Sequence, residues 1–408
     1  MPITGQRKAL SHLYRPQGPK LISTLTATPG SAPTLIQSVD LTVPIRGFRL
    51  VMKGRVVVGT ANITTVNVEH LLNLLSNILI QGISKRQGGN VVLWNIGLSE
   101  LFNFSHMSDV RGGIFSVNNG TGGEVVAMAP SSPLGYYGVQ EVASVPTLVG
   151  LFNTGGTAGA TGTYDYKVIV DLPAYPIDAP AGVRSAYILR QDEWKDSIQF
   201  KFTFAPADTN ATPQGLGTPG VTTTLTFTSY GSGAGSPTLD VYALPIVLGD
   251  LRNSILPGVI QRAVQPVGSL VQTTGNNIEL LRMQKQATPR VYMKTGVINA
   301  QGFYSSVSDA IITAVGIQLG TDRNVRDVLD VFSHKQDQVE HYGTIPTQGY
   351  AVLDFVQSGN SDSSYPGDEL GDGTTYRIVA NVTGAANQQA LFYQEQILYK
   401  PEGQLAGG

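Results

Sequence analysis

Alternation of polar and apolar residues is the dominant pattern along the chain, and it predicts β-strands. The clearest case is QFKFTF at residues 199–204, where aromatic side chains at every second position would share one face of a sheet. Other segments are rich in β-branched or aromatic residues and end at Gly, Pro, Asn or Asp, as strands do. We expect these further strands at 35–45, 47–59, 164–172, 221–229, 239–247, 290–298, 348–357, 375–382 and 390–399.

Helical spacing is rare in comparison. The strongest helix candidate is 324–335, where Asp322 or Asn324 could cap the first turn. Its apolar stripe would consist of Val325, Val328, Leu329 and Phe332. A second short helix is expected near 97–106. The chain is therefore predicted to be mainly β.

Short similarities recur in the same order in the two halves of the chain, which predicts a duplicated module. RLVMKGRVV at 49–57 resembles RVYMKTGVI at 290–298, with Arg, Met and Lys in register. About twenty residues later, the apolar run that begins at Leu71 corresponds to the run that begins at Ile311.

Two further matches continue this order. FSHMSD at 104–109 matches FSHKQD at 332–337, and each segment ends a helix-like stretch. YKVIV at 166–170 resembles YRIVA at 376–380. The offset between the copies falls along the chain, as longer loops in the first copy would cause, because surface loops accept insertions at little cost.

The matches and the turn residues together divide the chain. A stretch with Pro257, Gly258, Pro266 and Gly268 indicates a linker between the copies. The Thr-, Gly- and Ser-rich segment 206–238 is interpreted as a long surface excursion with a hairpin in it. The predicted parts are an N-terminal arm at 1–34, a first module at 35–250, a linker at 251–268, a second module at 269–400 and a tail at 401–408.

Composition narrows the class of protein. Charged residues make up only 14% of the 408 residues, against about 25% in an average soluble protein. The net charge is −2 and 41% of residues are hydrophobic, which argues against disorder. A surface so poor in charge suggests burial in subunit contacts. The absence of cysteine excludes disulfides, thiolate zinc sites and cysteine nucleophiles.

Membrane insertion is not expected. The longest apolar stretch, Leu71 to Ile83, falls short of the roughly 20 residues that a spanning helix needs. The N-terminal residues also lack the apolar core of a signal peptide.

Positive charge gathers at the N-terminus, where no acidic residue precedes Asp40. One interpretation is a solvated terminus. The other is an arm that lies against an anionic lipid or nucleic-acid surface, where each cation contributes about 1 kcal/mol. The residues of this candidate membrane-facing site are Arg7, Lys8, Arg15 and Lys20.

One helical spacing could bind a metal ion. His334, Asp337 and His341 would share a helix face. We favour a polar helix end instead, because a fourth ligand and supporting partners are not evident and because His106 and Asp109 repeat the pattern in the other copy. No metal site is therefore predicted.

Other candidate chemistry is weak. The acidic loop 360–373 could hold calcium or be simply solvated, and these alternatives stay open. GLGTPG at 215–220 leads into a strand, so it lacks the helix N-terminus that a dinucleotide requires. Asp192 and Glu193 are adjacent, so in a strand they would point to opposite faces and could not act as a glycosidase pair. We expect no catalytic residue, no cofactor and no enzymatic activity.

Four segments, together with the order of elements, carry a resemblance to a known family: IRGFRLVMKGRVVV near 45, YDYKVIVDLPAYPIDAPAGVRSAYIL at 164–189, SIQFKFTF at 197–204 and NQQALFYQEQILY at 387–399. In these the chain resembles the major coat proteins of tailless, membrane-containing bacteriophages of the tectivirus type, in the double jelly-roll lineage of adenovirus hexon. The resemblance implies an all-β fold in which each module is an eight-stranded jelly roll.

The same resemblance implies a structural role. Three chains would form a pseudo-hexagonal homotrimer, and trimers would tile an icosahedral capsid shell in the virion. The implied partners are further copies, other capsid and vertex proteins and inner-membrane lipids near the N-terminal arm, with no specific nucleic acid. The alternative is a trimeric receptor-binding, fibre or lectin-like β protein. That alternative requires an exposed aromatic site, for which Trp94 and Trp194 are weak candidates.

Overall fold

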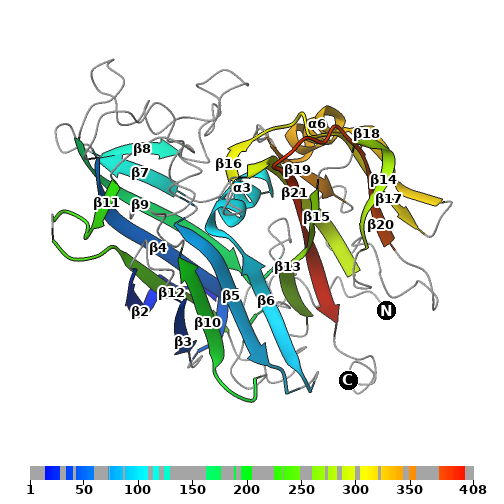
Figure 1. Ribbon diagram of the computed structural model, residues 1–408. Helices are drawn as coiled ribbons and strands as arrows, with labels where there is room; N and C mark the ends of the chain where they lie inside the picture. Colours follow the sequence, from blue (N-terminus) through cyan, green and yellow to red (C-terminus); the bar gives the residue numbers. More distant parts are fainter. Residues whose placement is uncertain are drawn as a thin grey trace, which may run out of the picture.

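The protein folds into β-sheets with two helices among the residues that the computed structural model describes (Figure 1). The described residues are 14–27, 34–39, 43–58, 72, 74–85, 88–108, 114–118, 124–128, 162–175, 188–189, 194–204, 225–232, 234–248, 260–271, 274–282, 287–298, 304–319, 323–342, 349–354 and 376–399.

The first module is a sandwich of two antiparallel sheets. One sheet has the central order β2-β12-β4-β9, and the other has the order β3-β10-β5-β6. The four strands of the first set are β2 (Lys20–Thr26), β12 (Thr238–Leu248), β4 (Ile45–Val58) and β9 (Gly162–Pro173). Those of the second set are β3 (Thr34–Val39), β10 (Ile198–Phe204), β5 (Leu75–Ile83) and β6 (Asn90–Ile96).

Short strands extend the first of these sheets. Strand β1 also pairs with β12, β7 and β8 extend the sheet beyond β9, and β11 pairs with the end of β4. Their bounds are β1 (Tyr14–Pro16), β7 (Ile114–Asn118), β8 (Glu124–Met128) and β11 (Leu225–Thr228).

The second module repeats the arrangement. Its sheets have the orders β13-β21-β15-β19 and β14-β20-β17-β18, with β16 added beside β15. The bounds are β13 (Ile260–Val271), β14 (Gly275–Arg282), β15 (Ala287–Ile298), β16 (Tyr304–Val307), β17 (Ile312–Leu319), β18 (Arg323–Asp330), β19 (Tyr350–Asp354), β20 (Tyr376–Val382) and β21 (Gln388–Tyr399).

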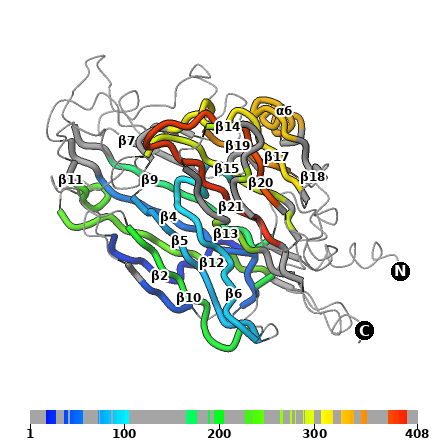
Figure 2. The backbone as a smooth tube through the Cα atoms, turned by 45° about the vertical axis from the view of Figure 1, so that its right-hand side comes forward, coloured from blue at the N-terminus to red at the C-terminus, as the bar shows by residue number. Residues whose placement is uncertain are grey.

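Each module is therefore an eight-stranded jelly roll. In both, the first strand pairs with the eighth, the eighth with the third and the third with the sixth, while the second, seventh, fourth and fifth form the facing sheet. The all-β prediction of two tandem jelly rolls is confirmed. Strands β6 and β13 lie side by side and join the modules into one sheet (Figures 1 and 2).

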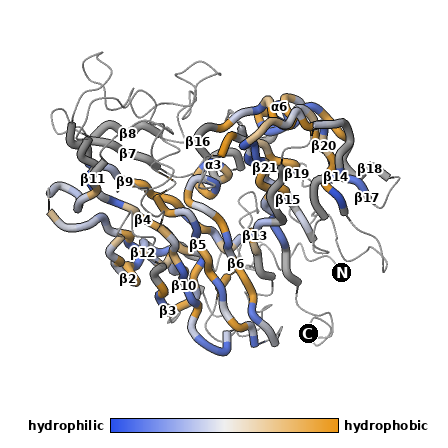
Figure 3. Tube along the Cα trace, in the orientation of Figure 1, coloured by the Kyte–Doolittle hydropathy of each residue, from blue (hydrophilic) through white to orange (hydrophobic). Residues whose placement is uncertain are grey.

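Strand alternation builds the core of the first module. In β10, Ile198, Phe200, Phe202 and Phe204 are buried, while the residues between them face outward. Phe200 meets Phe48 of the facing sheet edge to face, with ring centroids 4.8 Å apart. The colours of Figure 3 change between hydrophobic and hydrophilic along strands such as β5 and β10, as this alternation requires.

The two helices occupy equivalent places. Helix α3 (Leu98–Ser108) follows β6, the fifth jelly-roll strand of the first module, and α6 (Val331–Tyr342) follows β18, the fifth strand of the second. The helix expected near 97–106 is confirmed. Neither described helix is long and apolar enough to cross a membrane.

The prediction of a helix over 324–335 is wrong in its first half. Residues 323–330 are β18, which pairs with β17, and the helix begins at Val331. The actual cap is Asp330, whose carboxylate accepts bonds from the backbone N–H and the hydroxyl of Ser333 at 2.9 and 2.6 Å. Valines and leucine at 325–329 suit a strand as well as a helix, and pairing with β17 decides between them.

Two of the four repeat matches do not relate equivalent positions. YKVIV lies in β9, which pairs with β4, whereas YRIVA lies in β20, which pairs with β17 in the facing sheet. FSHKQD lies near the start of α6, whereas Phe104 is in the second half of α3. The match of 49–57 to 290–298 does hold, because β4 and β15 are the third strand of their modules.

The predicted linker 251–268 is strand from Ile260 onward, so the linker prediction is wrong for that part. Strand β13 tolerates Pro266 because its pairing with β21 shifts register between Pro266 and Gly268, and proline is accepted at such bulges. The predicted arm 1–34 also contains β1 and β2, both paired with β12.

Candidate functional site

Helix α3 of the first module packs on the outer side of a sheet of the second. Glu100, in the first turn of α3, forms an ion pair with Lys294 of β15, with Oε1 and Nζ 2.7 Å apart. The hydroxyls of Ser99 and Tyr350 are hydrogen-bonded at 3.2 Å. All four residues are buried, so these polar groups depend on one another as partners.

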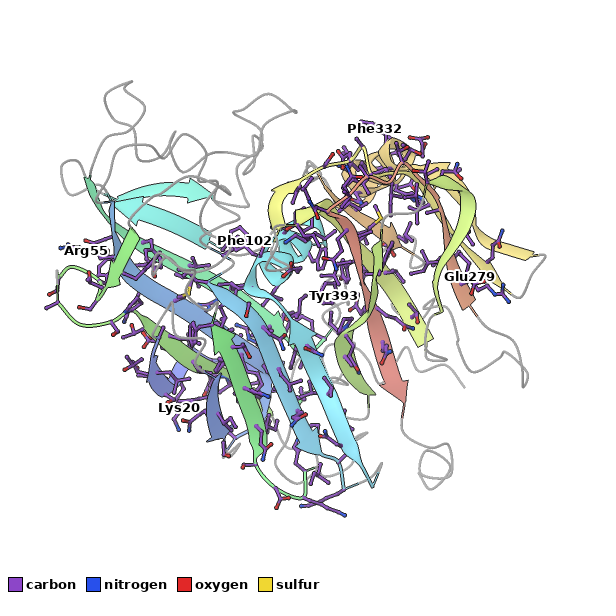
Figure 4. The ribbon with its side chains drawn as sticks, in the orientation of Figure 1. Lys20, Arg55, Phe102, Glu279, Phe332 and Tyr393 are labelled. Carbon is purple, nitrogen blue, oxygen red and sulfur yellow. The ribbon has the colours of Figure 1, made fainter. Side chains whose placement is uncertain are left out.

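Aromatic rings complete this contact. The ring of Phe104 stacks on Tyr292 at 4.6 Å and meets Tyr350 and Tyr393 edge to face at 5.8 and 5.6 Å. Each such pair adds about 0.5–1.5 kcal/mol beyond area burial. Figure 4 shows Tyr393 on its strand across from Phe102 of α3. The core of the first module therefore continues into the second.

We call the sheet surface under α3 the covered face, and its members are Arg290, Tyr292, Lys294, Tyr350, Val352, Asp354, Tyr393 and Glu395. Val291 and Met293 belong to the core between the sheets of the second module, so their neighbours along β15 point the other way. Arg290 contacts Asp354 at 3.5 Å and Glu395 at 3.2 Å. These charges are buried and paired, as buried charges must be.

The first module has a matching surface, which we call the open face: Arg49, Val51, Lys53, Lys167, Ile169 and Asp171. Leu50 and Met52 point into the core, so their neighbours on β4 point outward. Arg49 lies opposite Asp171 in the sheet, as Arg290 lies opposite Asp354. The arginine–aspartate pair is thus repeated at the same place in both modules.

The two copies of this pair differ in their surroundings. Arg49 binds Asp171 through two bonds of 2.6 and 2.9 Å, and their side chains are 33% and 34% exposed, against 0% and 7% for Arg290 and Asp354. The bond to Asp171 raises the pKa of Arg49. The open face is therefore a charged, partly solvated version of the covered face.

Two further ion pairs are found, one at Lys53 of the open face and one at Arg55 beside it. Lys53 binds Asp240 of β12 at 2.7 Å. Arg55 binds Asp165 at 2.7 and 2.9 Å, and this bond, with a further one from the N–H of Gly231, lowers the pKa of Asp165. Arg55 lies at the edge of the first module in Figure 4.

Helix α6 has an exposed apolar face. Phe332 is 68% exposed and Val339, two turns on, is 40% exposed, with Leu329 of β18 close in sequence. The helix is held to its own module by the opposite side, where Gln338 donates to the carbonyl of Val352 at 3.1 Å. Figure 4 shows Phe332 at the outer edge of the second module.

His334 lies in the first turn of α6 and packs inside the second module, rather than at a polar helix end as we expected. It is buried, and its Nε2 lies 2.8 Å from the carbonyl oxygen of Val315. The next residue, Lys335, binds both oxygens of Asp309, and burial lowers its pKa. Among the described residues no three metal-binding side chains gather. The side chains of His106 and His341 and the whole of Asp109 lie outside the described residues.

The other predicted candidates are only partly placed. Lys20 is exposed at the start of β2, and Arg15 lies in β1, while Arg7 and Lys8 are outside the described residues. Also outside them are the acidic loop 360–373, GLGTPG at 215–220, Asp192 and Glu193. Trp94 and Trp194 are fully buried.

Sequence comparison identifies no relative: no protein-family model matches the chain, and no curated protein matches it. Solved structures do match in fold. The STIV MCP crystal structure has a TM-score of 0.59 at 12% identity, covering 97% of this chain and 99% of that chain. A chain in the atomic structure of Sulfolobus Turreted Icosahedral Virus has a TM-score of 0.56 at 12% identity, covering 96% and 93%.

A third match is PBCV-1 VP54, fitted into a reconstruction of the virophage Sputnik. Its TM-score is 0.52 at 12% identity, covering 95% of this chain and 94% of that chain. These neighbours are double jelly-roll proteins. The agreement extends over nearly the full length of each chain, so both modules and their order are shared.

Proposed function

We propose that this chain is a major capsid protein that forms pseudo-hexagonal homotrimers, which tile an icosahedral shell over an internal membrane. The observation that carries the proposal is the pair of jelly rolls with the same strand order, fixed to each other by α3. Three such chains supply six similar modules. A six-sided tile made from a trimer requires this duplication within each chain.

The structural neighbours support the same function. The matched proteins come from structures of Sulfolobus Turreted Icosahedral Virus and of PBCV-1 VP54 in a virophage reconstruction. The proposal places this chain in the virion shell, in contact with other copies of itself, with other capsid and vertex proteins and with membrane lipids.

Rigid coupling of the modules suits a shell subunit. The Glu100–Lys294 ion pair, the Phe104 cluster and the pairing of β6 with β13 fix the angle between the two jelly rolls. A tile keeps its shape only if this angle is constant, because each module faces a different neighbour.

The alternative of a lectin-like or fibre protein is less well supported. Carbohydrate sites commonly use an exposed aromatic ring, and both tryptophans are buried in the first module. The one large aromatic side chain strongly exposed among the described residues is Phe332, which lies on a helix face with other apolar residues.

The test is the mass and arrangement of the native protein. Sedimentation of the purified chain is expected to give a trimer, three times the 43.3 kDa of one chain. Electron microscopy of the particles from which it comes is expected to show it as the dominant shell component in six-sided tiles. A stable monomer that binds or cleaves glycans would contradict the proposal.

A further inference from the structure

We propose that strand β3 of one copy pairs edge to edge and antiparallel with β3 of a second copy, and that this contact joins neighbouring trimers. The two strands are related by a two-fold axis, with Ile36 of one copy opposite Ile36 of the other. The inference rests on the proposed coat function, because it names a contact between tiles. It follows from the place, the composition and the exposure of β3.

Strand β3 forms a free edge of the first module. All six of its residues pair with β10, from Thr34 opposite Thr203 to Val39 opposite Ile198. Among the strands that the structure describes, β10 is the one that pairs with it (Figure 1). The strand at the other end of this set, β6, is covered by β13 of the second module. The outer backbone groups of β3 therefore have no strand partner in the described part of the chain.

The sequence of β3 does not block further pairing. Natural edge strands are commonly protected by charged residues, prolines or bulges. The edge strands β8, β14 and β18 all contain charges, for example Glu124 in β8 and Glu279 in β14. Strand β3 has the sequence TLIQSV, without charge or proline, and its pairing with β10 is continuous over all six residues. It is thus suited to accept another strand.

The outer face of β3 has a strongly exposed aliphatic residue, Ile36. This residue lies opposite Lys201 of β10, and directly opposite residues share one face of a sheet. The phenylalanines on either side of Lys201 are buried in the core, so Ile36 points outward. It is 68% exposed, and a contact that removes it from water is favourable.

The occupant that fits this edge is a second β3. In an antiparallel pair with two-fold symmetry, the central residue lies opposite its own counterpart. With Ile36 at the centre, the two isoleucines have Cβ atoms about 4.5–5.5 Å apart and shield each other from water. Thr34 of each copy then lies opposite Ser38 of the other, a combination of residue types that stabilises sheets. The strand is therefore complementary to itself.

The charge beside Ile36 does not oppose this pairing. Lys201 is exposed on the neighbouring strand. The strand order across the contact is β10, β3, β3, β10, so the two lysines are three strand spacings apart, roughly 14 Å. This separation exceeds the Debye length of about 8 Å at physiological salt, so solvent ions largely screen their repulsion.

Symmetry places this contact between trimers. Each interface of a closed three-fold ring joins two different surfaces, whereas a two-fold contact joins a surface to itself. Strands of six residues also bury less surface than a stable protein–protein interface needs. Because each trimer has three copies of β3, several weak contacts act together once trimers meet in a shell.

The first experiment traps the contact with a disulfide, because the native chain has no cysteine. Opposite residues of antiparallel strands have Cα atoms about 4.5–5.5 Å apart, a separation that a disulfide spans. Ile36→Cys is expected to form chain pairs of twice 43.3 kDa when concentrated trimers are oxidised. Ile83→Cys, at an exposed isoleucine that ends β5, is the matched control and is expected to form none.

Two further variants test the register. Thr34→Cys and Ser38→Cys are each expected to form no pairs alone, because neither residue lies opposite itself. A mixture of trimers of the two variants is expected to form them. Equal yields from Ile36→Cys and Ile83→Cys, or no pairs from Ile36→Cys, would overturn the proposed pairing.

The second experiment places charge at the centre of the contact. Ile36→Lys and Ile36→Glu each bring like charges together and remove the buried isoleucine, so each is expected to weaken association between trimers at least about ten-fold in light scattering. A mixture of the two variants is expected to restore association, because lysine then lies opposite glutamate. Association that is unchanged in both variants, or that mixing does not restore, would show that β3 does not pair with a second β3.

The outcomes separate this inference from the proposed function. Ile36 variants that sediment as trimers with unchanged thermal melting, but give no Ile36→Cys pairs, would overturn the β3 contact and leave the coat function standing. A wild-type chain that stays monomeric under all conditions would overturn the coat function, and the contact between trimers with it.

Discussion

At the scale of single residues, two glycines with similar backbones have very different surroundings. Gly349 has φ +75°, and a Cβ there would lie 2.5 Å from Cβ of Val307 and 2.7 Å from the carbonyl oxygen of Thr295. Gly231 has φ +71° and no atom within 4 Å of that position. Alanine substitutions at Gly231 and Gly349 therefore distinguish the free-energy cost of backbone strain alone from the cost of strain together with crowding.

We expect Gly231→Ala to lower the free energy of unfolding by about 1–2 kcal/mol, the cost of a left-handed conformation for an L-residue. Gly349→Ala is expected to cost about 1–3 kcal/mol more, because the turn beside β15 must also move. Urea unfolding of both variants measures the difference. Equal losses would contradict the crowding at Gly349.

Asp330 gives a residue-scale prediction about pH. Bonds from Ser333 lower the pKa of this carboxyl below its ordinary value of 3.8. The stabilisation is therefore present at neutral pH and is lost as the pH falls through the lowered pKa. Asp330→Ala is expected to cost about 1 kcal/mol at pH 7, as loss of an N-cap does.

The control for this prediction is Asp330→Asn, which keeps a capping oxygen but does not titrate. The difference in free energy of unfolding between the wild type and the Asn variant is expected to narrow as the pH drops below 4. Chemical unfolding at a series of pH values across that range measures this difference. A gap that is constant with pH would contradict a role for the ionised carboxylate.

Residue patterns predicted part of the candidate site. The in-register Arg and Lys of 49–57 and 290–298 identified the strands that form the open and covered faces. The sequence did not show which of the two faces is buried, because burial of Lys294 depends on its partner Glu100, which lies 194 residues earlier in the chain. Similarly, the FSH segments that begin at 104 and 332 match by chance, because they lie at different positions along their helices: the first in the second half of α3 and the other near the start of α6.

At the scale of elements, the ion pair of Glu100 with Lys294 joins helix α3 to strand β15. Removing one partner would leave the other charge buried, at a cost of about 3–5 kcal/mol. We expect Glu100→Gln and Lys294→Met each to be strongly destabilising, and the double variant to lose less than the sum of the two. A double-mutant cycle from urea unfolding gives the coupling energy.

Additive losses would show that the two side chains act independently. Arg49→Met with Asp171→Asn is the matched cycle on the open face, where the side chains are about one-third exposed. Its coupling is expected to be about 1 kcal/mol or less in the isolated chain, because solvent screens the charges.

Element boundaries show where sequence patterns have limited power. Strands with strict alternation, such as β10, were placed within one residue. The segment at 323–330 was misassigned because its valines and leucine fit either a helix or a strand, and the choice depends on hydrogen bonds to β17. The start of β13 was missed because Pro266 and Gly268 suggest a turn, although they occupy a bulge.

At the scale of the whole molecule, the chain places its N-terminal strands in the first module. Arg15 lies in β1 and Lys20 begins β2, so a deletion of residues 1–20 would remove pairing with β12 as well as charge. Any membrane role of the arm is better tested at Arg7 and Lys8, by substitutions that leave both strands in place.

We propose that these two charges help the assembled protein to bind an anionic membrane. A basic residue near such a surface contributes about 1 kcal/mol, so Arg7→Gln or Lys8→Gln should weaken binding of the trimer to phosphatidylserine vesicles roughly five-fold per chain. Lys201→Gln, an equal change at an exposed residue of β10, is expected to have no effect. Added salt should reduce the difference, because screening shortens the reach of each charge. If the three variants bind alike at low salt, Arg7 and Lys8 do not contribute to membrane binding.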